Sequence, residues 1–135
     1  MNTADLIAID THTHLEVSCR NPFDSYGEEY DRAADKYFRS SRRPTMDETL
    51  AYYRAQKIGF VMFTVDAETQ LGRRRIPNEE IAEAALAHSD IMIAFGSIDP
   101  HKGKFGAREA RRLVEECGVK GFKFHPTVQG FEPAD

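Results

Sequence analysis

The sequence predicts an α/β fold in which parallel strands alternate with helices. Four short apolar runs are visible, at residues 6–10, 60–66, 91–99 and 121–125. They are nearly continuous rather than alternating, which is typical of strands buried on both faces of a parallel sheet. The last three runs begin at residues 60, 91 and 121, so they are 31 and 30 residues apart. That spacing is the size of one strand–helix unit.

Helical patterns fill the intervals between these strands. Residues 45–48 (Thr-Met-Asp-Glu) form a capping box, and Gly59 is the expected end of the helix that follows. Pro77 opens a second helix and Gly118 ends a third. Both carry apolar residues at helical spacing, and His88 lies on the stripe of the second, where we interpret it as structural.

An open doubly wound sheet and a (β/α) barrel both contain this order of elements. A nucleotide-binding doubly wound sheet needs a glycine-rich turn after its first strand. Here residues 11–16 follow the first strand, and the next glycine is Gly27. A closed barrel takes about 250 residues. We therefore predict about four βα units, the N-terminal half of a (β/α)8 TIM-barrel, and expect residues 1–135 to be the N-terminal portion of a longer protein.

The connection after the first strand is longer than the others. The step from residue 6 to residue 60 is 54 residues, and the surplus predicts a loop insertion at about residues 15–45. Its sequence is polar and aromatic. Because long loops at the carboxyl end of a strand often form site walls or lids, we expect this insertion to border a functional site.

Composition excludes several classes of protein. The 135 residues carry a formal net charge of −4, with 30% charged and 41% hydrophobic residues. The acidic balance predicts no nucleic-acid partner, and no apolar run approaches the ~18 residues of a membrane span. The first residues do not resemble a signal peptide, so we expect a cytoplasmic protein. Cys19 and Cys117 are far apart and predict neither a disulfide framework nor a cysteine-based zinc site.

The sharpest chemical feature is a pair of histidines, His12 and His14, directly after the first apolar run. Residues i and i+2 of a strand point the same way, so the two imidazoles should stand side by side. Neutral imidazole nitrogens suit zinc, iron, nickel and copper, although a solvated strand end would have the same sequence. Asp10 is expected on the same face, where it either orients a ligand histidine or hydrogen-bonds backbone.

The fourth strand carries a second set of candidates. Phe122 and Phe124 should share the face that packs under helices, and Lys123 and His125 the face toward the barrel interior. His125 is our candidate catalytic residue, able to bind metal, polarise a carbonyl or exchange protons, unless it is merely hydrogen-bonded inside the barrel. Lys123 needs a carboxylate partner, for which Asp10 is one candidate, or it is carbamylated and bridges metals.

Further candidates lie at the predicted strand ends. Asp66 ends the second strand and is a second catalytic candidate. Asp99 precedes a proline, so it is expected to shape a turn. His101, in the same turn, is either solvated or a substrate-binding residue.

Two arginine clusters, at residues 73–75 and 42–43, are expected at the mouth of the barrel. Arginine forks suit carboxylate or phosphate, so Arg73 is a candidate substrate-binding residue. A solvated charged face is the alternative interpretation.

Three segments together carry a resemblance to a known family. They are residues 10–14 (Asp-Thr-His-Thr-His), residues 95–103 (Phe-Gly-Ser-Ile-Asp-Pro-His-Lys-Gly), and residues 118–126 (Gly-Val-Lys-Gly-Phe-Lys-Phe-His-Pro) with 129–131 (Gln-Gly-Phe). In this order they resemble the amidohydrolase superfamily, and more narrowly its amidohydrolase-2 branch, which includes the aminocarboxymuconate-semialdehyde decarboxylases. Within the branch the chain looks most similar to proteins of aromatic-acid breakdown, including a hydroxyphenyl β-ketoacyl-CoA hydrolase.

The resemblance implies a distorted (β/α) barrel and a divalent metal, usually zinc. His12 and His14 match the ligand pair of the first strand. His125 matches a strand-four position near the site that is usually not a metal ligand. The family's other ligand histidine, its acid/base histidine and its metal-binding aspartate come from strands five, six and eight, which this sequence does not contain.

The resemblance and the residues together predict a metal-dependent hydrolase. We expect metal-activated water to attack a carbonyl-type substrate, with an aromatic or β-ketoacyl thioester as one candidate. The alternatives are a non-oxidative decarboxylase of an aromatic or enoic acid, and a truncated, non-catalytic binding or assembly half. The expected partners are a small-molecule substrate and either a second copy of the chain or the missing C-terminal half, with no nucleic acid and no membrane.

Overall fold

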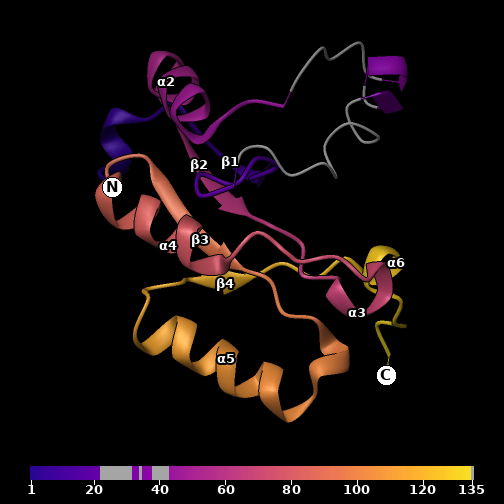
Figure 1. Cartoon of the computed structure of the whole chain (residues 1–135). Helices are drawn as coiled ribbons and strands as arrows, with labels where there is room; N and C mark the ends of the chain where they lie inside the picture. Colours follow the sequence, from indigo (N-terminus) through magenta and orange to yellow (C-terminus); the bar gives the residue numbers. More distant parts are fainter. Residues whose placement is uncertain (22–31, 34, 38–42, 135) are drawn as a thin grey trace.

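The computed structural model describes residues 1–21, 32–33, 35–37 and 43–134 (Figure 1). Its strands are β1 (Ala8–His14), β2 (Ile58–Phe63), β3 (Met92–Gly96) and β4 (Gly121–Phe122). Its longer helices are α2 (Met46–Gln56), α4 (Asn78–Ala87) and α5 (Lys104–Glu115). Shorter helical turns are η1 (Thr3–Asp5), α3 (Glu68–Leu71), η2 (Pro100–Lys102) and α6 (Pro126–Gln129). Most of the predicted insertion at 15–45 lies outside the described residues.

The four strands form one parallel sheet in the order β1-β2-β3-β4. Figure 1 shows the helices following the strands in the same order, with α3 and α6 together at the carboxyl ends of the strands and the N-terminus at the opposite end. The predicted α/β class is confirmed. The sheet is a curled half-barrel that corresponds to the four N-terminal units of a (β/α)8 barrel.

The hydrophobic core lies between the sheet and the three longer helices. In the register of the strands, Phe60 pairs with Met92 and Met62 pairs with Ala94, so these side chains share one face of the sheet. All four belong to the buried core, together with Leu50 of α2, Ile81 of α4 and Leu113 of α5. This helix-covered face is the outer face, and the opposite face is the inner face of the half-barrel.

The beginning of α2 follows the prediction, but its end does not. Thr45 and Glu48 form the expected capping box. The helix ends at Lys57, which adopts a left-handed φ of 54°, whereas Gly59 lies inside β2. A Cβ at Gly59 would stand 2.9 Å from Leu6 Cδ1. The predicted role of Gly59 is therefore wrong, because the left-handed Lys57 and not Gly59 caps the end of the helix.

The first and last strands also differ from the predicted bounds. β1 continues to His14, so both histidines lie within the strand rather than after it. β4 ends at Phe122, although the N–H of Lys123 still donates to Gly96 O at 2.8 Å. Phe122 packs on the core, whereas Phe124 is 45% exposed, so the predicted packing of Phe124 under helices is wrong. The alternation of a strand no longer applies once the ladder has ended.

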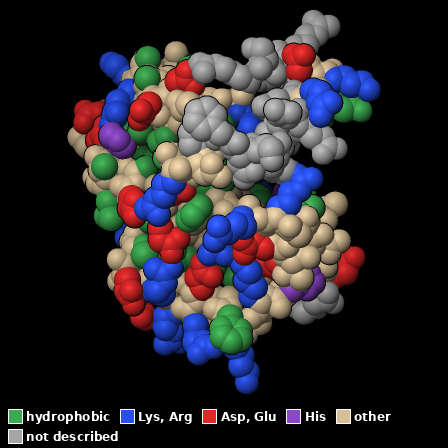
Figure 2. Space-filling view, in the orientation of Figure 1, with side chains coloured by type: hydrophobic (Ala, Val, Ile, Leu, Met, Phe, Trp, Pro, Cys, Tyr) green, Lys and Arg blue, Asp and Glu red, His purple; other side chains and the backbone are tan. Residues whose placement is uncertain are grey.

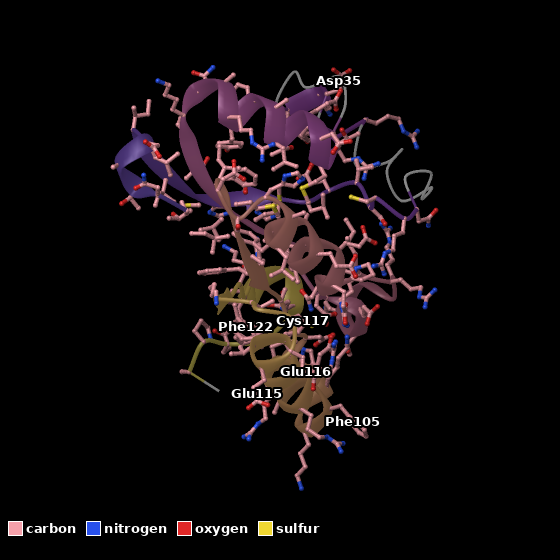
Figure 3. The ribbon with its side chains drawn as sticks, turned by 90° about the vertical axis from the view of Figure 1, so that its left-hand side faces the viewer. Asp35, Phe105, Glu115, Glu116, Cys117 and Phe122 are labelled. Atoms are coloured by element: carbon pink, nitrogen blue, oxygen red, sulfur yellow. The ribbon has the colours of Figure 1, made fainter. Side chains whose placement is uncertain are left out.

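The surface carries charged side chains of both signs. Figure 2 shows acidic and basic side chains mixed over the face that it presents, without a continuous basic patch. Figure 3 shows Phe105 at the free end of α5, pointing away from the sheet, where it is 73% exposed. No helix in the described part of the chain is long and apolar enough to cross a membrane.

Candidate functional site

The two histidines of β1 come together as predicted. His12 Nε2 and His14 Nε2 are 3.0 Å apart, and the ring planes are 29° from parallel. Both rings pack against Phe63 of β2, with centroid distances of 5.4 and 4.7 Å. Zinc–imidazole bonds are about 2.0–2.1 Å long. Because the two nitrogens are closer than twice that length, one ion can contact both, and the donor pair fits a divalent metal.

The environment of His14 keeps its ring neutral. Burial, followed by the nearby charges of His12, Lys123 and His125, lowers the pKa of His14 to about 4. A neutral imidazole presents a lone pair, which is the form that ligates a metal. His14 is therefore ready to bind an ion at neutral pH without first losing a proton.

Asp10 lies on the outer face, so the predicted position beside the histidines is wrong. Its Oδ2 accepts the hydroxyl of Tyr53 in α2 at 2.6 Å, and its Oδ1 accepts the backbone N–H of His12 at 2.9 Å. The hydrogen bond from Tyr53, followed by the one from His12, holds the pKa of Asp10 below its usual value. Of the two roles predicted for Asp10, the structure therefore shows the second, a hydrogen bond to the backbone.

Lys123 lies toward the barrel interior as predicted, but its suggested partner Asp10 does not contact it. Lys123 Nζ lies 5.3 Å from the centroid of the Phe63 ring, which both histidines also contact, and this is a cation–π distance. Asp10 is on the other face of the sheet, bonded to Tyr53, and is not the partner of Lys123.

His125 lies just beyond β4 and caps α6. Its Nδ1 accepts the backbone N–H of Val128 at 3.4 Å. The predicted strand position is wrong because β4 ends earlier and Pro126 begins α6, where a missing N–H costs nothing. Since Nδ1 accepts a hydrogen bond, the proton of the neutral ring resides on Nε2.

A cavity of about 360 Å³ connects His14 with His125. The arginines of residues 73–75 line it, and so do the aliphatic side chains of Leu15 and Val65. Arg43 also borders the cavity, whereas Arg42 lies outside the described residues. The cavity therefore combines a histidine wall, an apolar wall and an arginine rim at the carboxyl ends of the strands. Arg73 therefore lines the cavity, and its role in binding substrate stays a prediction.

Asp66 does not line this cavity. Its carboxylate is fully buried and accepts hydrogen bonds from Arg75 Nη1 at 3.0 Å, Lys102 Nζ at 2.7 Å and the N–H of Asp99 at 3.1 Å. Glu68 completes the cluster by pairing with Lys102 at 2.7 Å. These contacts give Asp66 a structural role. Its predicted catalytic role is not tested by them.

His101 and Asp99 belong to the turn after β3. Asp99 accepts the N–H of His101 at 2.9 Å, so it caps η2 and shapes the turn as expected. His101 is exposed, and its Nε2 lies 2.8 Å from the carbonyl oxygen of Gln129. That contact ties η2 to α6 and places His101 outside the cavity wall. The alternative that His101 binds substrate stays a prediction.

The sequence analysis missed two residues that support the site. Gln129 is fully buried, and its Oε1 accepts the N–H of His125 at 2.7 Å. Tyr53 supports His12 through Asp10. Both residues lie inside or beside segments that the sequence analysis had singled out, but nothing in the local pattern distinguishes a supporting amide or phenol from an ordinary surface one.

The described residues supply a partial metal-ligand set. Among them, no group of three or more His, Cys, Asp or Glu side chains is arranged to hold an ion. Catalytic zinc sites usually have three protein ligands and an open position. His12 and His14 thus fit two positions of such a site.

Parallel βα units with a histidine pair at the carboxyl end of the first strand define a class, the barrel enzymes that hold metal at this edge of the sheet. The family model described as amidohydrolase matches residues 9–135. The chain belongs to this family, in its amidohydrolase-2 branch, which comprises metal-dependent hydrolases and decarboxylases. No curated protein and no solved structure gave a significant match.

Proposed function

We propose that this chain forms the metal-binding half of the active site of a metal-dependent hydrolase. The observation that carries the proposal is the 3.0 Å separation of His12 Nε2 and His14 Nε2 on the inner face of β1. Zinc is the proposed ion, because imidazole nitrogens suit it. When bound, such an ion polarises a carbonyl oxygen and increases the acidity of coordinated water.

The remaining residues would bind and orient the substrate. His125 can donate from Nε2 to a carbonyl oxygen or to a leaving atom, because its Nδ1 is occupied by Val128. Arg73 can bind a carboxylate or phosphate at the rim, while Leu15 and Val65 contact an apolar body. An aromatic or β-ketoacyl thioester would supply the carbonyl oxygen and the apolar body.

A non-oxidative decarboxylase of an aromatic or enoic acid is the second candidate. The three consecutive arginines at the cavity rim favour it, since a carboxylate is then the reacting group as well as the recognised one. The two candidates share the metal site and differ in the substrate and in the bond that is broken.

The rest of the ligand set is proposed to come from further barrel strands, in the same polypeptide or in a partner chain. Exposed apolar side chains at the outer strands support this: Ile7 immediately before β1, Ile9 within β1 and Phe124 after β4. We propose a cytoplasmic setting, which the free thiols of Cys19 and Cys117 fit.

Zinc titration of the full chain by calorimetry tests the proposal. We expect saturable binding at one site per chain, which His12→Ala and His14→Ala each abolish. His88→Ala is the matched control, because this histidine lies on the outer side, bonded to Arg54 at 3.0 Å. Equal zinc affinity in His12→Ala contradicts the metal site, and a folded wild-type chain without saturable binding favours a binding or assembly role instead.

Two small molecules test whether the arginine rim of the cavity recognises an anionic group. Benzoate should shift the NMR signals of Arg73 and His125, and neutral benzamide of the same shape should not. Arg73→Gln should remove the difference between the two probes. Equal shifts from both probes contradict recognition of an anionic group.

A further inference from the structure

β1 contains an extra residue at the point where the histidines begin. Asp10 pairs with Phe60 of β2, but the next printed pair joins Thr13 to Met62. Two residues of β1, Thr11 and His12, therefore stand opposite Val61 alone, which is the arrangement of a β-bulge.

The bulge decides which face the histidines occupy. Phe60 and Met62 both point to the outer face, so their partners Asp10 and Thr13 point there too. His14 pairs with Phe63 and points to the inner face, where its ring also meets that of His12. In a regular strand, residues 10, 12 and 14 would all share one face. Only the extra residue lets Asp10 face the helices while both imidazoles face the barrel interior.

Two side chains bond to the backbone at this irregularity. Asp10 Oδ1 accepts the backbone N–H of His12 at 2.9 Å. The buried hydroxyl of Thr13 donates to the carbonyl oxygen of Val61 at 2.6 Å. These bonds engage backbone groups on both strands at the bulge, and a buried backbone group left unpaired is costly.

Tyr53 fixes the carboxylate of Asp10 from outside the sheet. Its hydroxyl donates to Asp10 Oδ2 at 2.6 Å, and its ring packs on Phe60 with a centroid distance of 4.5 Å. The chain of contacts thus runs from α2 through Asp10 to the backbone of His12, without touching either imidazole.

We propose that Asp10, Thr13 and Tyr53 are positioning residues that hold the bulge of β1 and so turn His12 and His14 to a common point. The inference rests on the proposed metal-binding role of the pair. The positioning residues touch neither substrate nor metal and act only through the backbone of β1. Outer partners of this kind typically change metal affinity by about 10–100-fold when removed.

Two matched pairs of variants of the full chain test the proposal. Thr13→Val and Tyr53→Phe each remove one hydroxyl of the bulge network and keep the shape of the side chain. Thr11→Val and Tyr52→Phe are the controls, because Thr11 and Tyr52 are exposed neighbours of the same chemistry. Thr13→Ser keeps the hydroxyl and should restore wild-type behaviour.

The first readout needs no metal. We expect Thr13→Val and Tyr53→Phe to weaken the nuclear Overhauser contact between the rings of His12 and His14 and to speed hydrogen exchange at the His12 amide. The second readout is zinc affinity, which should fall about tenfold in each variant and stay within about twofold in the controls.

The outcomes separate this inference from the proposed function. If the Thr13→Val/Tyr53→Phe double variant keeps the ring contact, the amide protection and the zinc affinity of its controls, the positioning role is wrong, even where its urea midpoint falls. If the wild-type chain binds no zinc, the proposed function fails, and the ring contact and amide exchange still decide the positioning role. If the double variant does not fold, the comparison of Thr13→Val with Thr13→Ser decides it.

Discussion

The side chain of Gln129 holds the backbone of His125: its Oε1 accepts that N–H at 2.7 Å. The Nε2 of the same amide donates to the carbonyl oxygens of Asp66 and Ile98 at 2.7 and 2.9 Å. One buried amide therefore joins the ends of β2, β3 and β4, and it fixes where His125 enters the cavity.

Gln129→Leu should destabilise the fold strongly. Leucine fills a similar volume but leaves three buried backbone groups without this partner, and each such loss costs about 1–3 kcal/mol. We expect the free energy of unfolding to fall by about 3 kcal/mol or more in a urea titration. Thr127→Ala, at an exposed position of the same helix, is the control and should change it by less than about 0.5 kcal/mol. A loss no larger than that of Thr127→Ala would show that water replaces the amide.

Asp66→Ala should destabilise the fold by removing a buried carboxylate that two cations share. Asp66 is completely buried between Arg75 and Lys102, and breaking a buried ion pair on one side costs about 3–5 kcal/mol. We expect the lower end of that range, since Glu68 still pairs with Lys102 and Glu109 still pairs with Arg75. Thermal unfolding of the variant measures the loss.

Asp90→Ala is the matched control for Asp66. Asp90 pairs with Arg54 at 3.0 Å on the surface, where an ion pair contributes about 1 kcal/mol or less. Similar losses in the two variants would contradict the structural role given to Asp66.

Thr45→Ala tests the capping box that opens α2. The Thr45 hydroxyl accepts the N–H of Glu48 at 3.3 Å, and loss of such a cap typically costs about 1 kcal/mol. We expect a reduction of that size in the free energy of unfolding, measured in urea. Glu48→Gln retains the capping geometry and should cost less; the reverse order would show that the charge of Glu48 at the helix start matters more than the threonine hydroxyl.

Periodicity predicted the elements well where buried apolar runs are long. The α/β class, the parallel order of four strands and the capping box at Thr45 all followed from spacing and composition. The pairing of His12 with His14 also followed, because two residues separated by one neighbour share a face in any strand.

The face of Asp10 could not be predicted, because one inserted residue reverses every side chain beyond it. The burial of Asp66 could not be predicted for a different reason. Its strand ends at Phe63, and its partners Arg75 and Lys102 are distant in sequence, so no local pattern indicates that its carboxylate is enclosed. Bulges and buried ion pairs depend on tertiary contacts, which a single sequence does not display.

His14 should titrate far below an ordinary histidine. Burial, followed by the positive charges of His12, Lys123 and His125, lowers its pKa from the ordinary 6.5 to about 4. The folded state therefore prefers the neutral ring. That preference contributes stability fully above pH 6.5, and it is lost as the pH falls from 6.5 toward 4, because the unfolded chain takes up the proton first.

Two measurements check the titration of His14. The NMR shift of its ring proton should have a midpoint near pH 4, and Lys123→Met should raise that midpoint by removing a neighbouring positive charge. His14→Asn should flatten the fall in urea midpoint between pH 7 and pH 5 relative to the wild-type chain, whereas the surface variant His88→Asn should not. A midpoint between pH 6 and 7 in the wild-type chain would mean that water reaches the ring freely, and the neutral, ligand-ready state of His14 would then owe nothing to the fold.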